Sequence, residues 1–327
     1  MYADLLTRVA DDIAAAGPCA QLLRGHEDDP GPSALALRLL GSVHRLVLGG
    51  LAPALARCYP SSGGTWVPDT CWSEFRATVE GQSEAVRALL DQPPQTNEVG
   101  RSAALLGGML HAAKEHRLPI RLLEIGCSAG LNLRADHFCY HSGSGPVWGS
   151  QDSPVQLAGA WRGNLPPMMA ALEVVERHGV DVAPIDPFSD DGRLTLMAYV
   201  WPDQTARFER LRGAIEVAAR VPATVRQRDA AAFMQNIELQ GGSTTVLWHS
   251  VMWQYVPRRD QQTMTERLSE LGRLATASRP FVHLFLEPTR RRPGAPHEFL
   301  VVTTSWPGGE RRILGDAHGH GIPVTWT

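Results

Sequence analysis

The sequence predicts an α/β protein with a mainly parallel sheet and a separate helical domain at its N-terminus. Three observations support this fold class. Residues 1–118 have helical periodicity with no competing strand, whereas residues 119–327 alternate short apolar runs with amphipathic helical patterns. Between them, residues 121–133 (RLLEIGCSAGLNL) pass from a buried strand through a glycine-rich turn into a helix. We therefore expect a helical cap domain over 1–118 and an α/β domain over 119–327.

The composition is that of a folded globular protein. Its 327 residues are 43% hydrophobic and 20% charged, which is enough for one large domain or two modest ones with a real core. With a net charge of −3, the sequence lacks the excess of basic residues that is typical of nucleic-acid-binding proteins. We interpret the run Arg290–Arg292 as a solvated loop. We therefore expect a small-molecule partner and no nucleic acid, with a monomer and a homodimer both left open.

The cysteines and the N-terminus bear on localisation. The five cysteines are odd in number and have no C-x-x-C spacing, which supports neither a disulfide framework nor a zinc site, so no metal is expected. The first residues carry acids where a signal peptide carries positive charge, and no apolar run is long enough to span a bilayer. We expect a soluble, cytoplasmic protein without a membrane partner.

Three helices are expected in the cap domain. Ser33 is a plausible N-cap for a helix that ends at Gly49–Gly50, and a second helix is predicted over 71–90. The third begins near Asn97, which could cap it, and runs to Pro119, directly before the first strand of the sheet.

The glycine-rich turn is the clearest functional signal. Residues 122–125 read as a buried parallel strand because a strand covered on both faces shows a continuous apolar run. The small residues of 126–130 let a ligand approach the backbone closely, and the helix after them directs free N–H groups toward it. We therefore expect this turn to bind a cofactor.

The pattern of the turn narrows the choice of cofactor. A phosphate-binding P-loop ends in Gly-Lys-Ser/Thr, and Lys114 is the only lysine of the chain. The dinucleotide fingerprint G-x-G-x-x-G also fails, because Ser128 occupies its second glycine position and Leu131 its third. What remains is acid-x-Gly-x-x-x-Gly, with Glu124 at the tip of the strand.

This pattern resembles the first motif of class I S-adenosylmethionine-dependent methyltransferases; the alternative is an ordinary strand-to-helix turn of another α/β protein. The resemblance implies a Rossmann-like sheet of seven strands with S-adenosyl-L-methionine as cofactor. It also implies that the glycines pass beneath the methionine portion and that the acid faces its ammonium and sulfonium region. The expected cofactor-binding residues here are Glu124, Gly126, Cys127, Ser128, Ala129 and Gly130.

A β insertion displaces the second strand. Glycine and serine turns separate short apolar runs over 138–165, which predicts an antiparallel insertion. The next strand then lies within 171–182 and ends at Asp181, in a Gly-x-Asp context that resembles the second methyltransferase motif. Its acid would hold the ribose. Asp152 lies about 20 residues beyond the glycine turn, the usual spacing for such an acid, but it sits within a turn; Asp186 is a further candidate.

Two later segments supply the remaining candidates. Asp229–Ala230 resembles the third motif, in which an acid takes the adenine amino group and a backbone N–H meets the ring; Asp229 is also a plausible helix N-cap. A strand over 246–248 is followed by a segment that resembles the fourth motif, near the methyl group and the acceptor. There His249 is the candidate general base and Tyr255 the candidate acceptor-orienting group, although the Asp/Asn-Pro-Pro-Tyr/Phe signature is missing.

Arg101, in the first turn of the third helix, is our candidate for pairing with the cofactor carboxylate; the alternative is a surface charge. A strand ending at Glu287, and an antiparallel hairpin over 299–317 with the closing run IPVTW at 322–326, would complete the sheet. Together these segments resemble, over nearly the whole chain, a bacterial family that carries only a domain-of-unknown-function label.

The expected function is therefore methyl transfer from S-adenosylmethionine to an unidentified small molecule enclosed by the cap. Two alternatives are a non-catalytic protein that binds the same cofactor, and a nucleotide-dependent oxidoreductase, which the failed dinucleotide fingerprint disfavours.

Overall fold

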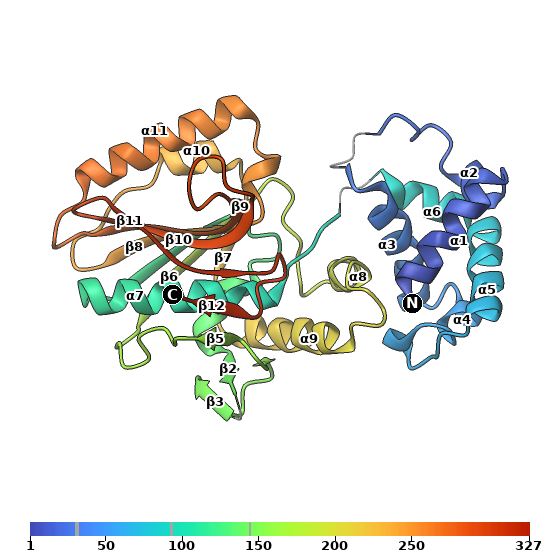
Figure 1. Cartoon of the computed structure of the whole chain (residues 1–327), viewed down its shortest axis with the longest axis horizontal. Coiled ribbons are helices and arrows are strands. Elements are labelled where there is room, and N and C mark those ends of the chain that lie inside the picture. The colour runs from blue at the N-terminus through green and yellow to red at the C-terminus, as the bar shows by residue number, and fades with distance from the viewer. Residues whose placement is uncertain (30–32, 92–93, 144) are drawn as a thin grey trace. The chain divides into compact units, whose positions relative to one another are not determined.

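The computed structural model describes residues 1–29, 33–91, 94–143 and 145–327, which form two compact units (Figure 1). The first unit comprises Met1–Thr96 and Ile185–Glu209, and the second comprises Asn97–Pro184 and Arg210–Thr327. These limits differ from the expected boundary at residue 118. The helix over 102–116 belongs to the second unit because it packs on the sheet.

The first unit is helical, as its periodicity predicts. Its core is formed by the apolar faces of the helices, including Val43 and Leu46 of α3, and Phe75 and Val79 of α5, all of which are buried. Its elements are α1 Tyr2–Ala14, α2 Pro18–Leu22, α3 Leu35–Leu48, α4 Pro53–Ala56, the 3-10 helix Pro60–Ser62, α5 Pro68–Gly81, α6 Ser83–Leu90 and α8 Asp190–Ala198. Helix α9, Thr205–Arg220, begins in a segment of the first unit and ends in one of the second.

Two helix limits in this unit differ from expectation. The N-cap of α3 is Ala34, whose backbone is left-handed at φ +53°, and not Ser33. The helix expected over 71–90 is two helices, because Gln82 leaves helical geometry with φ −122° and ψ 27° between α5 and α6. A local signal for the second difference was present in the sequence, because Gly81 is the last residue of α5, directly before Gln82.

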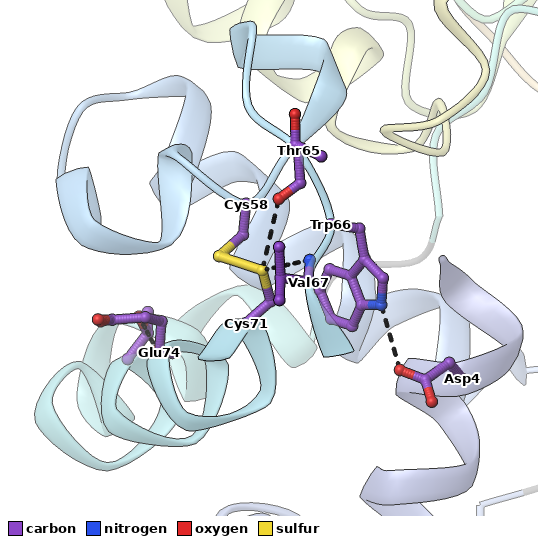
Figure 2. Close-up of a disulfide and its surroundings, with 8 residues drawn as sticks. Asp4, Cys58, Thr65, Trp66, Val67, Cys71 and Glu74 are labelled. Atoms are coloured by element: carbon purple, nitrogen blue, oxygen red, sulfur yellow. Dashed lines mark hydrogen bonds between the residues drawn. A yellow bond between two sulfur atoms is a disulfide. The ribbon is translucent and has the colours of Figure 1, made fainter. Parts of the chain in front are cut away.

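A disulfide joins Cys58 to Cys71 in the first unit, contrary to the expectation that the cysteines stay unpaired (Figure 2). Cys58 follows α4, and Cys71 lies in the first turn of α5, where Val67 N donates to its sulfur over 3.1 Å. Only the packing of α5 against the preceding segment brings these two residues together. The free, buried cysteines are Cys19, Cys127 and Cys139. Cytoplasmic localisation remains a prediction, and it loses the support of unpaired cysteines.

The second unit is built on a nine-stranded mixed sheet, which confirms the α/β class but not the expected count of seven. The strand order is β5-β12-β11-β10-β9-β8-β1-β6-β7. Two strands beyond seven extend the edge next to β11: β12, which lies in the predicted closing run 322–326, and the insertion strand β5, which was not expected in this sheet. The strands are β1 Ile120–Ile125, β5 Trp161–Gly163, β6 Val174–Asp181, β7 Thr224–Gln227, β8 Thr244–Ser250, β9 Phe281–Thr289, β10 Glu298–Trp306, β11 Glu310–Ala317 and β12 Val324–Trp326.

Strand β1 lies at the point where the order of the sheet reverses. The chain goes from β1 to β6 and β7 on one side, then returns to β8 and β9 on the other, and these five strands are parallel to one another. The carboxyl ends of β1, β6 and β8 therefore meet at a topological switch point, where ligands bind in open α/β sheets.

Helices cover both faces of the sheet (Figure 1). Helix α7, Ser102–His116, packs on one face, and a Cβ added to Gly107 or Gly108 would lie within 2.3 Å of Trp326 or Leu284 side-chain atoms. The paired glycines thus allow the helix to approach the strands closely. Helices α10, Ala230–Gln235, and α11, Arg258–Leu274, cover the other face, over a core that includes Leu123 and Leu247.

The insertion forms a small three-stranded sheet of β2 Cys139–Ser142, β3 Gly145–Trp148 and β4 Gln156–Leu157. Strand β3 pairs antiparallel with β2 as expected, whereas β4 pairs parallel with it. Tyr140 anchors this sheet: its hydroxyl donates to Ala135 O over 2.7 Å, and its ring stacks on Trp161 at 5.1 Å between centroids. Within the described ranges, none of the helices is long and apolar enough to cross a membrane.

The disulfide gives a first prediction. Its cysteines are 13 positions apart, and closing a loop of about 15 residues stabilises a protein by about 3 kcal/mol. We expect the double variant Cys58→Ser, Cys71→Ser to lose about this amount of unfolding free energy in chemical denaturation. Reductant should destabilise the wild type but not the variant. Thiol titration of the unfolded, unreduced wild type should find three free thiols, and five would contradict the pairing.

Candidate functional site

The turn after β1 has the backbone conformation that its sequence suggests. Gly126, Ser128 and Gly130 all have positive φ, at +67°, +52° and +68°. Ser128 therefore adopts, without being a glycine, the left-handed conformation that glycine prefers at this position. A Cβ on Gly126 would lie 2.9 Å from Cβ of Met252, so this position is restricted by space as well as by conformation.

Asp181 is the residue that holds this turn against the next strand. It ends β6, and its Oδ2 accepts a hydrogen bond from Ser128 N over 2.8 Å while Oδ1 accepts from Ala183 N over 3.0 Å. The carboxylate of the predicted ribose-binding acid therefore lies beside the glycine turn. Each carboxylate oxygen has a second lone pair, so both remain able to accept a ligand hydroxyl.

Cys127 and Ala129 point their side chains into the protein. Both are buried, and Cys127 packs so close to β6 that a Cβ on Gly179 would lie 2.7 Å from its sulfur. Burial, followed by the nearby Glu124, raises the pKa of the Cys127 thiol well above its ordinary value, so the thiol stays protonated. The Cys127 N–H donates to Val180 O over 3.1 Å. Cys127 and Ala129 could therefore contact a ligand only through backbone atoms other than the Cys127 N–H.

Glu124 is the most unusual residue at this edge. It is 3% exposed, and among the described residues its Oε2 has no hydrogen-bond partner. Burial raises its pKa to about 8, although the indole of Trp248 and the charge of Arg134 favour the ionised form. Trp248 lies directly opposite on β8, and its own Nε1 has no partner in the described part of the chain. Glu124 is therefore a mostly protonated carboxyl group at neutral pH.

The segment before α7 contacts the other side of the turn. Asn97 Oδ1 accepts from Leu131 N over 2.9 Å, and Asn132 Nδ2 donates to Glu98 O over 3.2 Å. Asn97 therefore does not cap α7, which begins at Ser102. It caps instead the 3-10 helix Leu131–His137, which stands where an α-helix was expected.

Arg101 reaches the carboxyl end of β8. Its Nη1 donates to Ser250 O over 3.2 Å and its Nε donates to Gly319 O over 3.0 Å. The side chain is thus held near the switch point and is not a free surface charge. Its predicted role as partner of a cofactor carboxylate stays a prediction.

Asp229 and Ala230 lie at the same edge, after β7. Asp229 Oδ1 accepts from Ala232 N over 2.9 Å, which confirms it as the N-cap of α10. Gln227, at the end of β7, pairs with Asp181, so the two acids follow neighbouring strand ends. The structure therefore brings Asp229 to the edge that holds Glu124 and Asp181, with its carboxylate exposed.

His249 and Tyr255 are not brought to that edge. Trp248 shares a sheet face with its register partner Glu124, so the next residue, His249, points to the opposite face. There His249 Nδ1 lies 2.8 Å from Glu287 Oε1, and its Nε2 lies 3.0 Å from His283 Nε2. Tyr255 is 64% exposed. The sequence placed His249 at the carboxyl end of this strand without indicating a sheet face, and its role as general base stays a prediction.

A cavity of about 350 Å³ opens beside His249, on the face of the sheet that α11 covers. Two of its polar residues, His283 and Glu287, were not singled out from the sequence. The signal was present, because His283 and Glu287 recur with even spacing in the otherwise apolar run PFVHLFLEP. The cavity is lined by His249, Trp253, Gln254, Thr265, Leu268, His283, Phe285, Glu287, Pro288, Thr289, Thr304 and Arg311.

A metal centre has no structural support in the described ranges, where no group of three or more His, Cys, Asp or Glu residues is placed to hold an ion.

These features define the class of the protein: an α/β protein with a strand-end acid and a left-handed, glycine-containing turn at the switch point of its sheet. The chain belongs to the family described as "Uncharacterized protein conserved in bacteria (DUF2332)", whose sequence model matches residues 1–326. Neither the curated proteins nor the solved structures contain a match to it.

The pKa of Glu124 gives a second prediction. The folded state keeps the carboxyl group protonated up to about pH 8, whereas the unfolded chain releases the proton near the ordinary value of 4.5. Stability from this group is therefore present below about pH 4.5 and is lost as the pH rises toward 8, at up to about 1.4 kcal/mol per unit. In denaturation from pH 5 to 8, Glu124→Gln should gain a few kcal/mol relative to the wild type. A constant difference across this range would contradict the assignment.

Proposed function

We propose that the edge formed by Glu124, the turn 126–130, Asp181 and Asp229 binds S-adenosyl-L-methionine, and that the protein transfers its methyl group to a small molecule. The observation that carries this proposal is Glu124. Glu124 is a buried carboxyl group with one oxygen that has no hydrogen-bond partner among the described residues. Its position at a switch point, beside a close-packed turn, is suited to a cationic ligand.

Electrostatics support a positively charged ligand. Burial penalises the ionised carboxylate more than Trp248 and Arg134 favour it, which is why the pKa of Glu124 rises to about 8. A cation placed at Oε2 would remove that penalty, since an opposite charge favours the ionised form. S-adenosylmethionine carries two such groups, its ammonium and its sulfonium.

The other residues fit the remaining parts of this ligand. Asp181 keeps a free lone pair on each oxygen for ribose hydroxyls, and it orders the turn through Ser128 N. Asp229 and the start of α10 follow the next strand and take the adenine. When bound, the sulfonium supplies an activated methyl group, so the protein's tasks are alignment and the exclusion of water.

A second candidate is a protein that binds the cofactor without transferring its methyl group. The placement of His249 favours it, because the proposed general base points to the sheet face opposite Glu124 and is bonded to Glu287 and His283. An acceptor that loses no proton would not need a base, so this observation does not by itself remove the transferase.

Calorimetry with the full chain tests the proposal. We expect S-adenosylmethionine to bind and NAD not to bind. Glu124→Gln should weaken the binding at least tenfold, because the variant cannot form the carboxylate that compensates the ligand charge. Glu216→Gln, the same change on the exposed face of α9, should leave the affinity unchanged. Unaltered affinity in a folded Glu124→Gln protein would contradict the site.

Proton release provides an independent readout. Below about pH 8, binding of the cation should ionise Glu124, so calorimetry in buffers of different ionisation enthalpy should show a proton leaving the wild type but not Glu124→Gln. Incubation with methyl-labelled cofactor and a cell extract then separates the two candidates. Label in a small molecule supports the transferase, and tight binding without transfer supports the binding protein.

A further inference from the structure

The cavity beside His249 is a second candidate site, distinct from the turn after β1. It lies between α11 and the face of β8, β9 and β10 that points away from Glu124. Met252 stands between the two places: its side chain packs on Gly126, and its backbone N donates to Glu287 Oε1 over 3.0 Å. A volume of about 350 Å³ falls within the range of small-molecule pockets.

The polar end of this cavity is a hydrogen-bonded chain of three buried side chains. Glu287 Oε1 accepts from the backbone N–H groups of Met252 and Trp253, at 3.0 and 3.3 Å, which identifies it as an acceptor. His249 Nδ1, 2.8 Å away, must then be the donor of that contact. In the neutral form of the His249 ring, Nε2 is then an acceptor, and it receives the Nε2–H of His283 over 3.0 Å.

This order of donors leaves acceptors unused at the cavity. The neutral ring of His283 has one N–H group, at Nε2, which already donates to His249. Its Nδ1 therefore has a lone pair that can accept a hydrogen bond, and no described residue bonds to that atom. Burial, together with the neighbouring His249, lowers the pKa of His283 well below its ordinary value, which keeps the ring neutral. Glu287 is 5% exposed, and its Oε2 likewise has no partner among the described residues.

The walls of the cavity are flat and apolar. The ring of His249 stacks on Phe285 at 5.4 Å and on Trp253 at 5.2 Å between centroids, with interplanar angles of 10° and 24°. Leu268 of α11 contributes a buried aliphatic surface. Besides Glu287 and the two histidines, the titratable or charged lining residue is Arg311 of β11, which is exposed. Glu287 already accepts three hydrogen bonds, so a neutral donor suits this end better than a cation.

We propose that this cavity binds a small aromatic molecule carrying one O–H or N–H group, which donates to the acceptors presented by His283 and Glu287. The aromatic body stacks within the walls formed by Trp253 and Phe285. His249 acts as a positioning residue, because it sets the tautomer of His283 and touches the ligand only through its ring. This site does not depend on the cofactor proposal, since its occupant meets neither Glu124 nor the glycine turn.

Two probes of nearly equal shape test the proposal: phenol, which has the donor, and anisole, in which a methyl group replaces it. Binding to the full chain is followed by titration in solution. We expect saturable binding of phenol at least tenfold tighter than that of anisole, because anisole leaves the buried acceptors unpaired. In His283→Phe this preference should fall below about threefold while anisole still binds. His297→Phe, the same change at an exposed histidine outside the cavity, should keep the preference.

The proposal is overturned if neither probe binds saturably, if both bind wild type equally, or if the preference survives in His283→Phe. A measurement without substitution guards against a variant that fails to fold. The ¹⁵N resonances of the histidine side chains should show His249 protonated at Nδ1 and His283 at Nε2, and phenol should shift Nδ1 of His283. The opposite tautomer of His283 would equally overturn the proposal.

Discussion

The parallel pairing of β1 with both β6 and β8 is the constraint on which the rest of the second unit depends. It places the end of β1 at the point where the strand order reverses, and it sets Asp181 beside the turn that follows. The hydrogen bond from Ser128 N to Asp181 then holds that turn in its left-handed conformation. The position of Glu124, buried below the turn, follows from the same pairing.

The alternation of side chains along β8 separates two chemical environments. Trp248 lies over Glu124, whereas His249 points into the cavity with His283 and Glu287. Successive residues of one strand thus serve opposite faces of the sheet. On one face, the raised pKa of the Glu124 carboxyl group favours a cationic ligand. On the other face, the hydrogen-bond acceptors of His283 and Glu287 favour a neutral donor. The family description names no activity, so these two environments are what the chain offers for assigning one.

Local patterns predicted well those features that depend on neighbours in the chain. The strand limits around Glu124 and Asp181, and the N-cap at Asp229, follow from apolar runs, turn residues and capping preferences that act over a few positions. Two local helix limits differed from expectation, at Ala34 and Gln82. Other differences involve distant partners: Asn97, a possible cap of the helix that follows it, instead accepts a hydrogen bond from Leu131 N, 34 positions later, and no pattern within its own segment indicates this.

The sequence by itself determined the class of fold, the helical first unit and the glycine-containing turn with its strand-end acid, because periodicity and backbone conformation are local properties. The tertiary structure decided which side chains meet. It paired Cys58 with Cys71, added the insertion strand β5 to the sheet, and joined His249 to Glu287 across 38 positions. Such contacts depend on strand order and register, which set the face and the neighbours of each residue and leave no mark on the residues beside it.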